Sequence, residues 1–261
     1  MEIKILGVGG FANSGLPFNS YLIEGSVLVE TPPDILQSLK REGISLDSLD
    51  AVVLSHVHGD HCFGLPFLAF NLYLRRSPMG LPPPRLIAPP GASEVARSLL
   101  GRAISPDHPY VDWFFSGQEP AAMSHGSVQP CLPGLFLEFF RTEHSPETYS
   151  ILAKEDGAGE ASFISSSDTK WASRMGELFS RKAEILLCDG NGKGFGGVHL
   201  SPEEIRAFVK PLLKEGTRLL VTHITDYPDY KGESGDLEYA RPGMVLRTKG
   251  PTLPRLPMTG S

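Results

Sequence analysis

Four metal-capable side chains follow directly on a predicted buried strand, and this stretch constrains the fold more than any other. The apolar residues 51–54 are typical of a buried strand. The next residues read H-x-H-x-D-H, and the side chains concerned are His56, His58, Asp60 and His61. Alternate residues of an extended segment point the same way, so the first two can converge on one ion while the last two face a second. Zinc, iron and manganese all accept imidazole and carboxylate ligands. A chance histidine-rich turn is the weaker interpretation, because three of the chain's 8 His lie here.

Three single residues farther along the chain stand where a predicted strand gives way to a loop: His144, Asp168 and His223. Alone, each has an ordinary explanation, as a structural histidine or as an aspartate that caps a turn. Following H-x-H-x-D-H in this order, they resemble the ligand set of the metallo-β-lactamase-fold hydrolases. The matching stretches run from about residue 3 to residue 248. We therefore interpret all three as metal ligands.

The resemblance implies two divalent metal ions, with zinc as the first choice and manganese or iron as alternatives. By the family's pattern, the ligands of the first ion are His56, His58 and His144, and those of the second are Asp60, His61 and His223. Asp168 is then implied to bridge the two. Such ions, about 3.5–4 Å apart, lower the pKa of a shared water and stabilise attacking and leaving oxygens. Asp60 is also implied to be catalytic, by orienting that water or taking its proton.

Two further residues match the phosphodiesterase branch of the family. Asp189 ends the predicted strand 184–188, and His199 precedes a predicted helix. In that branch an acidic residue and a histidine at these places act together beside the metals, and the histidine protonates the leaving oxygen. Asp189 stands where the family more often has Glu. The alternative for His199 is a surface histidine at a helix start; His108 and His125 match nothing and are predicted to be surface residues.

The glycine-rich residues 192–197 contain G-x-G-x-x-G after a strand, but two observations argue against a dinucleotide site. The next helix begins only after His199, and no acidic residue ends a strand about 20 positions on, as that site requires. A calcium loop is excluded as well, since Lys193 and Leu200 occupy ligand positions. We predict a flexible flap beside the metals instead, in which glycine permits close backbone approach.

Composition restricts the class of protein. The chain has 261 residues, 41% hydrophobic and 21% charged, and no apolar run approaches the roughly 20 residues of a membrane span. The N-terminus reads as a strand without signal-peptide regions, and three Cys form no C-x-x-C pair, so a cytoplasmic protein is expected. The net charge of -6 counts against a long nucleic acid as substrate.

The pattern of elements predicts a mixed α/β class, and the resemblance implies a single domain over 1–261 with a four-layer αββα sandwich. The predicted strands are 2–6, 20–24, 26–30, 51–54, 86–88, 135–141, 147–153, 160–165, 184–188, 217–221 and 243–247, and the predicted helices are 33–41, the segment up to 75, 92–100, 172–182 and 201–214. Ser201, Pro202 and Glu204 form a capping-box pattern that begins the last helix. In the Pro-rich region 101–134, only 111–115 suggests a strand, and we predict that the region borders the substrate site.

Within the family, the residues favour a phosphodiesterase acting on a small or cyclic phosphodiester. Asp168 replaces the Cys of β-lactamases, and His58 replaces the Glu of flavodiiron proteins. Residues 30–36 resemble the D-T-P-P-D segment of small-molecule phosphodiesterases, with Glu30 in place of the first Asp. Open alternatives are a tRNA 3′-processing nuclease, an ester, thioester or lactone hydrolase, a mononuclear iron dioxygenase, and a metal-bound sensing protein without turnover. A homodimer is a further expectation.

Overall fold

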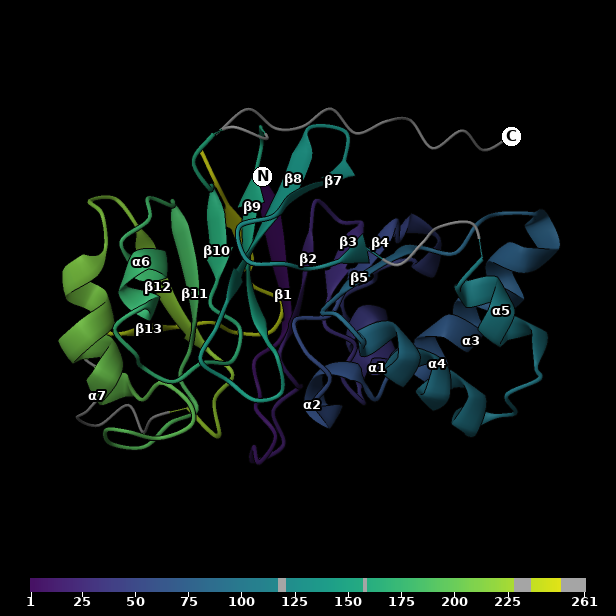
Figure 1. The fold of residues 1–261 in the computed structure, drawn as a ribbon, viewed down its shortest axis with the longest axis horizontal. Helices are drawn as coiled ribbons and strands as arrows, with labels where there is room; N and C mark the ends of the chain where they lie inside the picture. Colours follow the sequence, from purple (N-terminus) through teal and green to yellow (C-terminus); the bar gives the residue numbers. More distant parts are fainter. Residues whose placement is uncertain (117–120, 157–158, 228–235, 250–261) are drawn as a thin grey trace.

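The computed structural model describes residues 1–116, 121–156, 159–227 and 236–249. In this part of the chain, two seven-stranded sheets pack face to face, with helices on their outer sides (Figure 1). The predicted αββα sandwich is therefore confirmed. The prediction of one domain over 1–261 stays a prediction.

The first sheet comes mainly from the first half of the chain and has the order β14-β1-β2-β3-β4-β5-β6. Its strands are β1 (Glu2–Gly7), β2 (Ser20–Ile23), β3 (Val27–Val29), β4 (Ala51–Val53), β5 (Arg85–Ala88), β6 (Ala121–Ala122) and β14 (Val245–Arg247). The strands from β3 to β6 pair in parallel, so their carboxyl ends meet at one edge of the sheet.

The second sheet has the order β13-β12-β11-β10-β9-β8-β7. Its strands are β7 (Val128–Leu132), β8 (Leu135–Arg141), β9 (Tyr149–Lys154), β10 (Phe163–Ser165), β11 (Ile185–Asp189), β12 (Arg218–Thr222) and β13 (Glu238–Tyr239). Here β10 to β13 are parallel, whereas β7, β8 and β9 are antiparallel.

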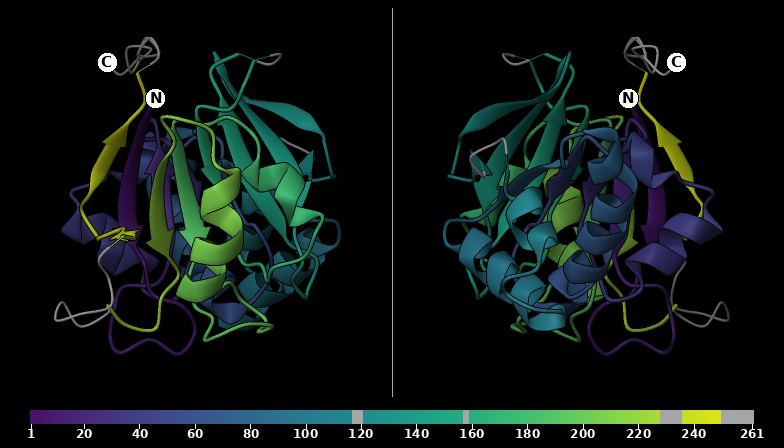
Figure 2. Two further views of the ribbon diagram at one scale, coloured as in Figure 1. Left: turned by 90° about the vertical axis from the view of Figure 1, so that its left-hand side faces the viewer. Right: turned by 90° about the vertical axis from the view of Figure 1, so that its right-hand side faces the viewer.

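Helices cover the outer face of each sheet, as the two side views of Figure 2 show. The helices beside the first sheet are α1 (Ile35–Arg41), α2 (Gly59–Cys62), α3 (Leu65–Arg76), α4 (Ala92–Ala103) and α5 (Pro109–Phe114). Those beside the second sheet are α6 (Met175–Phe179) and α7 (Pro202–Glu204), the latter continued by a π-helical turn (Ile205–Val209) and a 3-10 turn (Lys210–Leu212). Two more 3-10 turns, Leu46–Ser48 and Ser77–Met79, flank this set.

The apolar core forms two layers because the central strands are buried on both faces. In β4, Ala51 and Val53 face the second sheet, whereas Val52 faces the helices α1 to α5. This alternation of side chains explains why the strand reads as an unbroken apolar run. Across the sandwich, the rings of Tyr21 and Phe163 meet edge to face with centroids 5.4 Å apart.

One sequence-based assignment was wrong in kind, and two predicted helices were only partly correct. The predicted strand 111–115 is the helix α5, because His108 caps it by accepting from the Tyr110 N–H, and its buried residues Tyr110, Val111 and Phe114 follow helical spacing. The predicted helix 172–182 is reduced to α6, and the predicted helix 201–214 changes to π and 3-10 geometry after Glu204. The prediction also missed β6, β7 and β13; β7 contains Pro130, which an edge strand tolerates.

In its described parts, the region 101–134 contains the end of α4, then α5, β6 and β7, joined by irregular segments. Its proposed role beside a substrate site stays a prediction. None of the helices in the described ranges is both long and apolar enough to span a bilayer. All three cysteines, Cys62, Cys131 and Cys188, are free thiols.

Candidate metal centre

The seven predicted ligands lie at one edge of the sandwich, where strands of both sheets end. β4 leads into the segment with His56, and α2, at the lower edge of Figure 1, carries Asp60 and His61. In the second sheet, His144, Asp168 and His223 follow the ends of β8, β10 and β12. Ligand sites of α/β folds generally lie outside the carboxyl ends of strands, and this site follows that rule.

Backbone contacts between loops explain why these side chains converge. The Thr31 N–H donates to the carbonyl of His61 (2.7 Å), and the Gly64 N–H donates to the carbonyl of Thr31 (2.8 Å). A Cβ on Gly64 would lie 2.0 Å from the Pro32 carbonyl oxygen, so no larger residue fits there. In the second sheet, the Thr142 hydroxyl donates to the carbonyl of Asp168 (2.8 Å), which joins the loops of His144 and Asp168.

The first cluster consists of three imidazole nitrogens. The Nε2 of His56 lies 3.1 Å from the Nδ1 of His58, which lies 3.3 Å from the Nε2 of His144. The Oδ2 of Asp168 lies 3.6 and 3.7 Å from the Nε2 atoms of His56 and His144. These are the residues that the sequence assigned to the first ion.

The second cluster joins the end of the motif to the last predicted ligand. The Nε2 of His223 lies 3.2 Å from the Oδ2 of Asp60 and 3.3 Å from the Nε2 of His61. The other oxygen of Asp168, Oδ1, lies 3.5 Å from both the His61 Nε2 and the His223 Nδ1. Asp168 thus presents one oxygen to each cluster, as a bridging carboxylate requires.

The donor spacing fits divalent metal ions. Ligands about 2.0–2.1 Å from a tetrahedral centre are roughly 3.3–3.4 Å from one another, and the donor separations above are close to that value. One of these ligand atoms, the Asp168 Oδ1, is also buried without a hydrogen-bond partner among the described residues. An uncompensated polar atom at this depth is costly, and an ion between the clusters would compensate the carboxylate oxygen.

The electrostatics of the site also favour a cation. Burial lowers the pKa of His56, His58 and His144 and so keeps them neutral, which is the form that binds metals. Burial acts in the same direction on His223, but the carboxylates of Asp168, Asp189 and Asp60 outweigh it and raise the pKa of His223 to about 10. These carboxylates therefore favour positive charge around His223. A bound divalent ion can supply that charge in place of a proton.

Three residues that the sequence analysis did not assign to this role orient the candidate ligands from behind. The Ser55 hydroxyl lies 3.0 Å from the His56 Nδ1, and Glu30 lies 3.5 Å from the His61 Nδ1 while also accepting from the Ser55 N–H. Asp189 lies 3.2 Å from the Nδ1 of His223. Such contacts fix the orientation of a metal-ligating ring. The only sequence signal for Glu30 was its position at a strand end, in place of a family Asp.

Backbone strain accompanies this arrangement. Glu30, Ser167 and His223 have φ values of 66°, 50° and 53°, in the left-handed region that side chains other than glycine seldom adopt. Strained residues of this kind concentrate at functional sites, where the surrounding structure holds them. We interpret the strain as the cost of directing these three segments into the site.

Replacing Glu30 by glutamine is expected to weaken metal binding about 10- to 100-fold, because the neutral amide no longer holds the His61 ring as strongly. Competition with a chromophoric chelator measures the change in affinity. Glu24→Gln is the matched control, since Glu24 also has a positive φ (51°) but lies in the turn between β2 and β3. Equal metal affinity in the two variants would contradict the prediction.

The pair predicted beside the metals is brought together in spite of the shorter aspartate. The Nδ1 of His199 lies 2.9 Å from the Oδ2 of Asp189, whose carboxylate also accepts from the Thr169 N–H (3.0 Å). The centroid of the His199 ring lies 5.0 Å from the centroid of the His144 ring and 5.1 Å from that of the His223 ring. Burial alone would lower the pKa of His199, but Asp189 and Asp168 raise it, which favours the protonated ring.

Two histidines and one glycine-rich segment that the sequence singled out lie outside the candidate ligand set. His125 is exposed, as predicted, and its Nδ1 accepts from the Arg141 N–H. His108 is half-buried and caps α5, so its assignment to the surface was only partly correct. Residues 190–199 form a connection without helix or strand between β11 and α7, which ends beside the site at His199.

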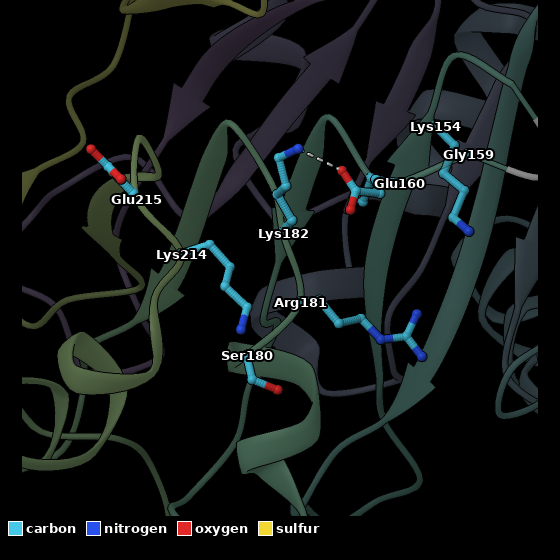
Figure 3. Close-up of a pocket in the computed structure, with 9 residues that line it drawn as sticks. Lys154, Gly159, Glu160, Ser180, Arg181, Lys182, Lys214 and Glu215 are labelled. Carbon is cyan, nitrogen blue, oxygen red and sulfur yellow. Dashed lines mark ion pairs between the residues drawn. The ribbon is translucent and has the colours of Figure 1, made fainter.

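A cavity of about 630 Å³ lies at the other end of the second sheet (Figure 3). Its walls carry Lys154, Arg181, Lys182 and Lys214 together with Glu160 and Glu215. Lys182 pairs with Glu160 at 2.9 Å, and Lys154 and Arg181 share the carboxylate of Glu138. Because ion pairs already hold three of these four cations, the cavity is a weaker candidate for an anionic ligand than the histidine-rich edge.

Comparison with known proteins identifies the family of this chain. The profile of the family "Anti-Pycsar protein Apyc1" matches residues 1–246. The Apyc1 protein of Saccharibacillus brassicae is 23% identical over 261 residues, covering 94% of this chain and 99% of the relative, and that of Paenibacillus sp. (strain J14) is 26% identical over 254 residues, covering 92% and 96%. A ribonuclease Z from Sulfolobus acidocaldarius is 30% identical over 159 residues, 59% of this chain and 48% of the relative.

Solved structures show the same fold. The metallo-β-lactamase fold protein YhfI of Bacillus subtilis has a TM-score of 0.72 at 18% identity and covers 94% of this chain and 99% of its own. The short form of human tRNase Z has a TM-score of 0.70 at 16% identity, and the match covers 95% of this chain and 99% of the other. A diphosphatase of the PhnP family has a TM-score of 0.69 at 19% identity, with coverage of 95% and 98% respectively. Together with the family match over residues 1–246, these likenesses establish that the chain has the metallo-β-lactamase fold and belongs to the anti-Pycsar Apyc1 family.

Proposed function

We propose that this protein is a metal-dependent phosphodiesterase that hydrolyses a small or cyclic phosphodiester. The observation that carries the proposal is the pairing of His199 with Asp189, 2.9 Å apart and beside the candidate ligands. Cleavage of an alkyl phosphodiester expels a strongly basic alkoxide, and a histidine held beside the metals can protonate that oxygen as the bond breaks. Family membership and the fold shared with a diphosphatase and a tRNase Z support the coarser assignment to metal-dependent hydrolases.

In this proposal, the ligands of two divalent ions are His56, His58 and His144, then Asp60, His61 and His223, with Asp168 between them. Bound there, divalent ions lower the pKa of a water and neutralise phosphate charge. Zinc is our first choice, and manganese and iron are also compatible with His and Asp ligands.

The chain's own residues account for the proton transfers. Asp60 accepts the proton of the attacking water or orients that water towards phosphorus. Asp189 holds the Nδ1–H of His199, so the opposite ring nitrogen, Nε2, is free to give its proton to the leaving oxygen as the phosphorus–oxygen bond breaks. The products are a phosphomonoester and an alcohol, which for a cyclic substrate remain in one molecule.

The first test compares hydrolysis of bis-p-nitrophenyl phosphate with that of p-nitrophenyl acetate, on protein loaded in turn with zinc, manganese and iron. Cyclic nucleotides and precursor tRNA are then tested as substrates. Metal-dependent cleavage of the diester and of a cyclic nucleotide is the expected result. Ester cleavage without diester cleavage under any metal would exclude the proposal and favour an esterase or lactonase.

Processing of tRNA is the second candidate, because ribonuclease Z matches part of the chain. We rank it lower since the net charge is -6 and the sequence has no long basic arm to hold tRNA. Cleavage of precursor tRNA at a higher kcat/KM than any cyclic nucleotide would reverse this order.

A further inference from the structure

The loop that carries His199 is joined by a hydrogen bond between its two ends, but its middle makes few contacts with the rest of the protein. The Gly192 N–H donates to the carbonyl of Leu200 (2.8 Å), and the Leu200 N–H donates to the carbonyl of Thr169 (2.8 Å). A Cβ on Gly192 would lie 2.3 Å from the His199 carbonyl oxygen, so glycine is required for this closure. Between these points, residues 193–196 are exposed, and both Gly194 and Gly196 have a positive φ.

One buried carboxylate outside the metal centre holds the middle of this loop. The Gly196 N–H donates to the Oε1 of Glu204 (2.9 Å), and this is the one hydrogen bond that the described structure gives to the backbone of residues 193–198. The ring of Phe195 adds an edge-to-face contact with Phe208, at 5.8 Å between centroids. Glu204 itself is only 2% exposed.

The same carboxylate fixes the chain on the other side of His199. Its Oε2 accepts from the Ser201 N–H (3.1 Å), and the Ser201 hydroxyl accepts from the Glu204 N–H (3.1 Å), which completes the capping box of α7. One carboxylate oxygen of Glu204 therefore accepts a hydrogen bond from the loop before His199, and the other accepts one from the start of α7 after His199. This arrangement sets the position of His199 from both flanks.

We propose that Glu204 is a positioning residue, which holds the loop of residues 193–198 so that His199 is directed at the leaving oxygen. The inference rests on the proposed phosphodiesterase function. Displacing an acid by about 1 Å can cost up to about 100-fold in rate. Substrate affinity should change little, because Glu204 is buried among protein groups and forms no part of the ligand clusters.

Glu204→Gln separates the two roles of the carboxylate. A glutamine satisfies a capping box as well as a glutamate does, so the start of α7 is kept. Its amide nitrogen, however, cannot accept from the Gly196 N–H, so the loop contact is lost. Glu203→Gln is the matched control, with the same change of charge one residue earlier on the same helix, at an exposed position.

The experiment measures cyclic-nucleotide hydrolysis and hydrogen exchange of the peptide that contains Gly196 in metal-loaded wild type and both variants. For Glu204→Gln we expect kcat to fall about 10-fold with KM within about 3-fold, and the loop amide to exchange at least about 10-fold faster. Hydrolysis of bis-p-nitrophenyl phosphate, whose leaving group needs no proton, should fall less. Glu203→Gln should behave as wild type in all three measurements.

The outcomes distinguish this inference from the function on which it rests. Equal exchange and equal kcat in the two variants would overturn the role of Glu204 while leaving the phosphodiesterase intact. An equal loss of activity with both diesters would also overturn it, because that result indicates a general loss of structure. Absence of diester turnover in the wild type would instead overturn the proposed function, and the role of His199 with it.

Discussion

Replacing Asp168 by alanine should abolish turnover and metal-dependent stabilisation together. Its two oxygens face different clusters, at 3.5 Å from His61 and His223 and at 3.6 Å from His56, so its removal affects both at once. Groups that merely orient a ligand contribute about 10- to 100-fold to metal affinity or activity, and loss of a bridging ligand should exceed about 100-fold. The measurements are metal content, kcat/KM on the diester, and the rise in Tm that added zinc causes.

The control for this variant is Asp107→Ala, which removes an exposed aspartate before α5. It should keep the metal content, the activity and the zinc-dependent rise in Tm, because surface substitutions usually change stability by no more than about 0.5 kcal/mol. A fully active Asp168→Ala protein with two bound ions would disprove the bridging assignment. A folded variant that retains one ion would show which cluster binds independently of the bridge.

Replacing His199 by alanine should remove catalysis without removing metal. General acids contribute typically about 10²- to 10⁴-fold, so a cyclic nucleotide with an alkoxide leaving group should lose rate in this range. Bis-p-nitrophenyl phosphate should lose less than about 10-fold, because its leaving group is stable as an anion. Metal content should stay unchanged, since His199 belongs neither to the group of His56, His58, His144 and Asp168 nor to that of Asp60, His61 and His223.

His125→Ala is the matched control, because this histidine is exposed on the connection between β6 and β7 and is absent from the clusters. Equal losses with both diesters in His199→Ala would argue against proton donation and for a role in phosphate binding. A drop in metal content would indicate instead that His199 is a ligand.

Sequence reasoning succeeded where the signal is local. Unbroken apolar runs marked β4 and β11, because a strand buried on both faces needs apolar residues throughout. The capping box of α7 was likewise legible from Ser201 and Glu204. The prediction from sequence failed at α5. A run of aromatic residues there suggested a strand, although the cap by His108 and the spacing of the buried residues define a helix.

The order of residues along the chain is enough to say which groups are available for the metal centre. Imidazoles and carboxylates stand at strand ends, and their identities depend on no distant contact. How these groups share the site became visible only in the folded chain. The Asp168 oxygens divide between two clusters, Asp189 contacts both His199 and His223, and Glu30 contacts His61. Most of these contacts form only when the two sheets pack and their loops close, because they join residues far apart in the chain, such as Asp189 and His223, 34 positions apart, and no local pattern encodes such contacts.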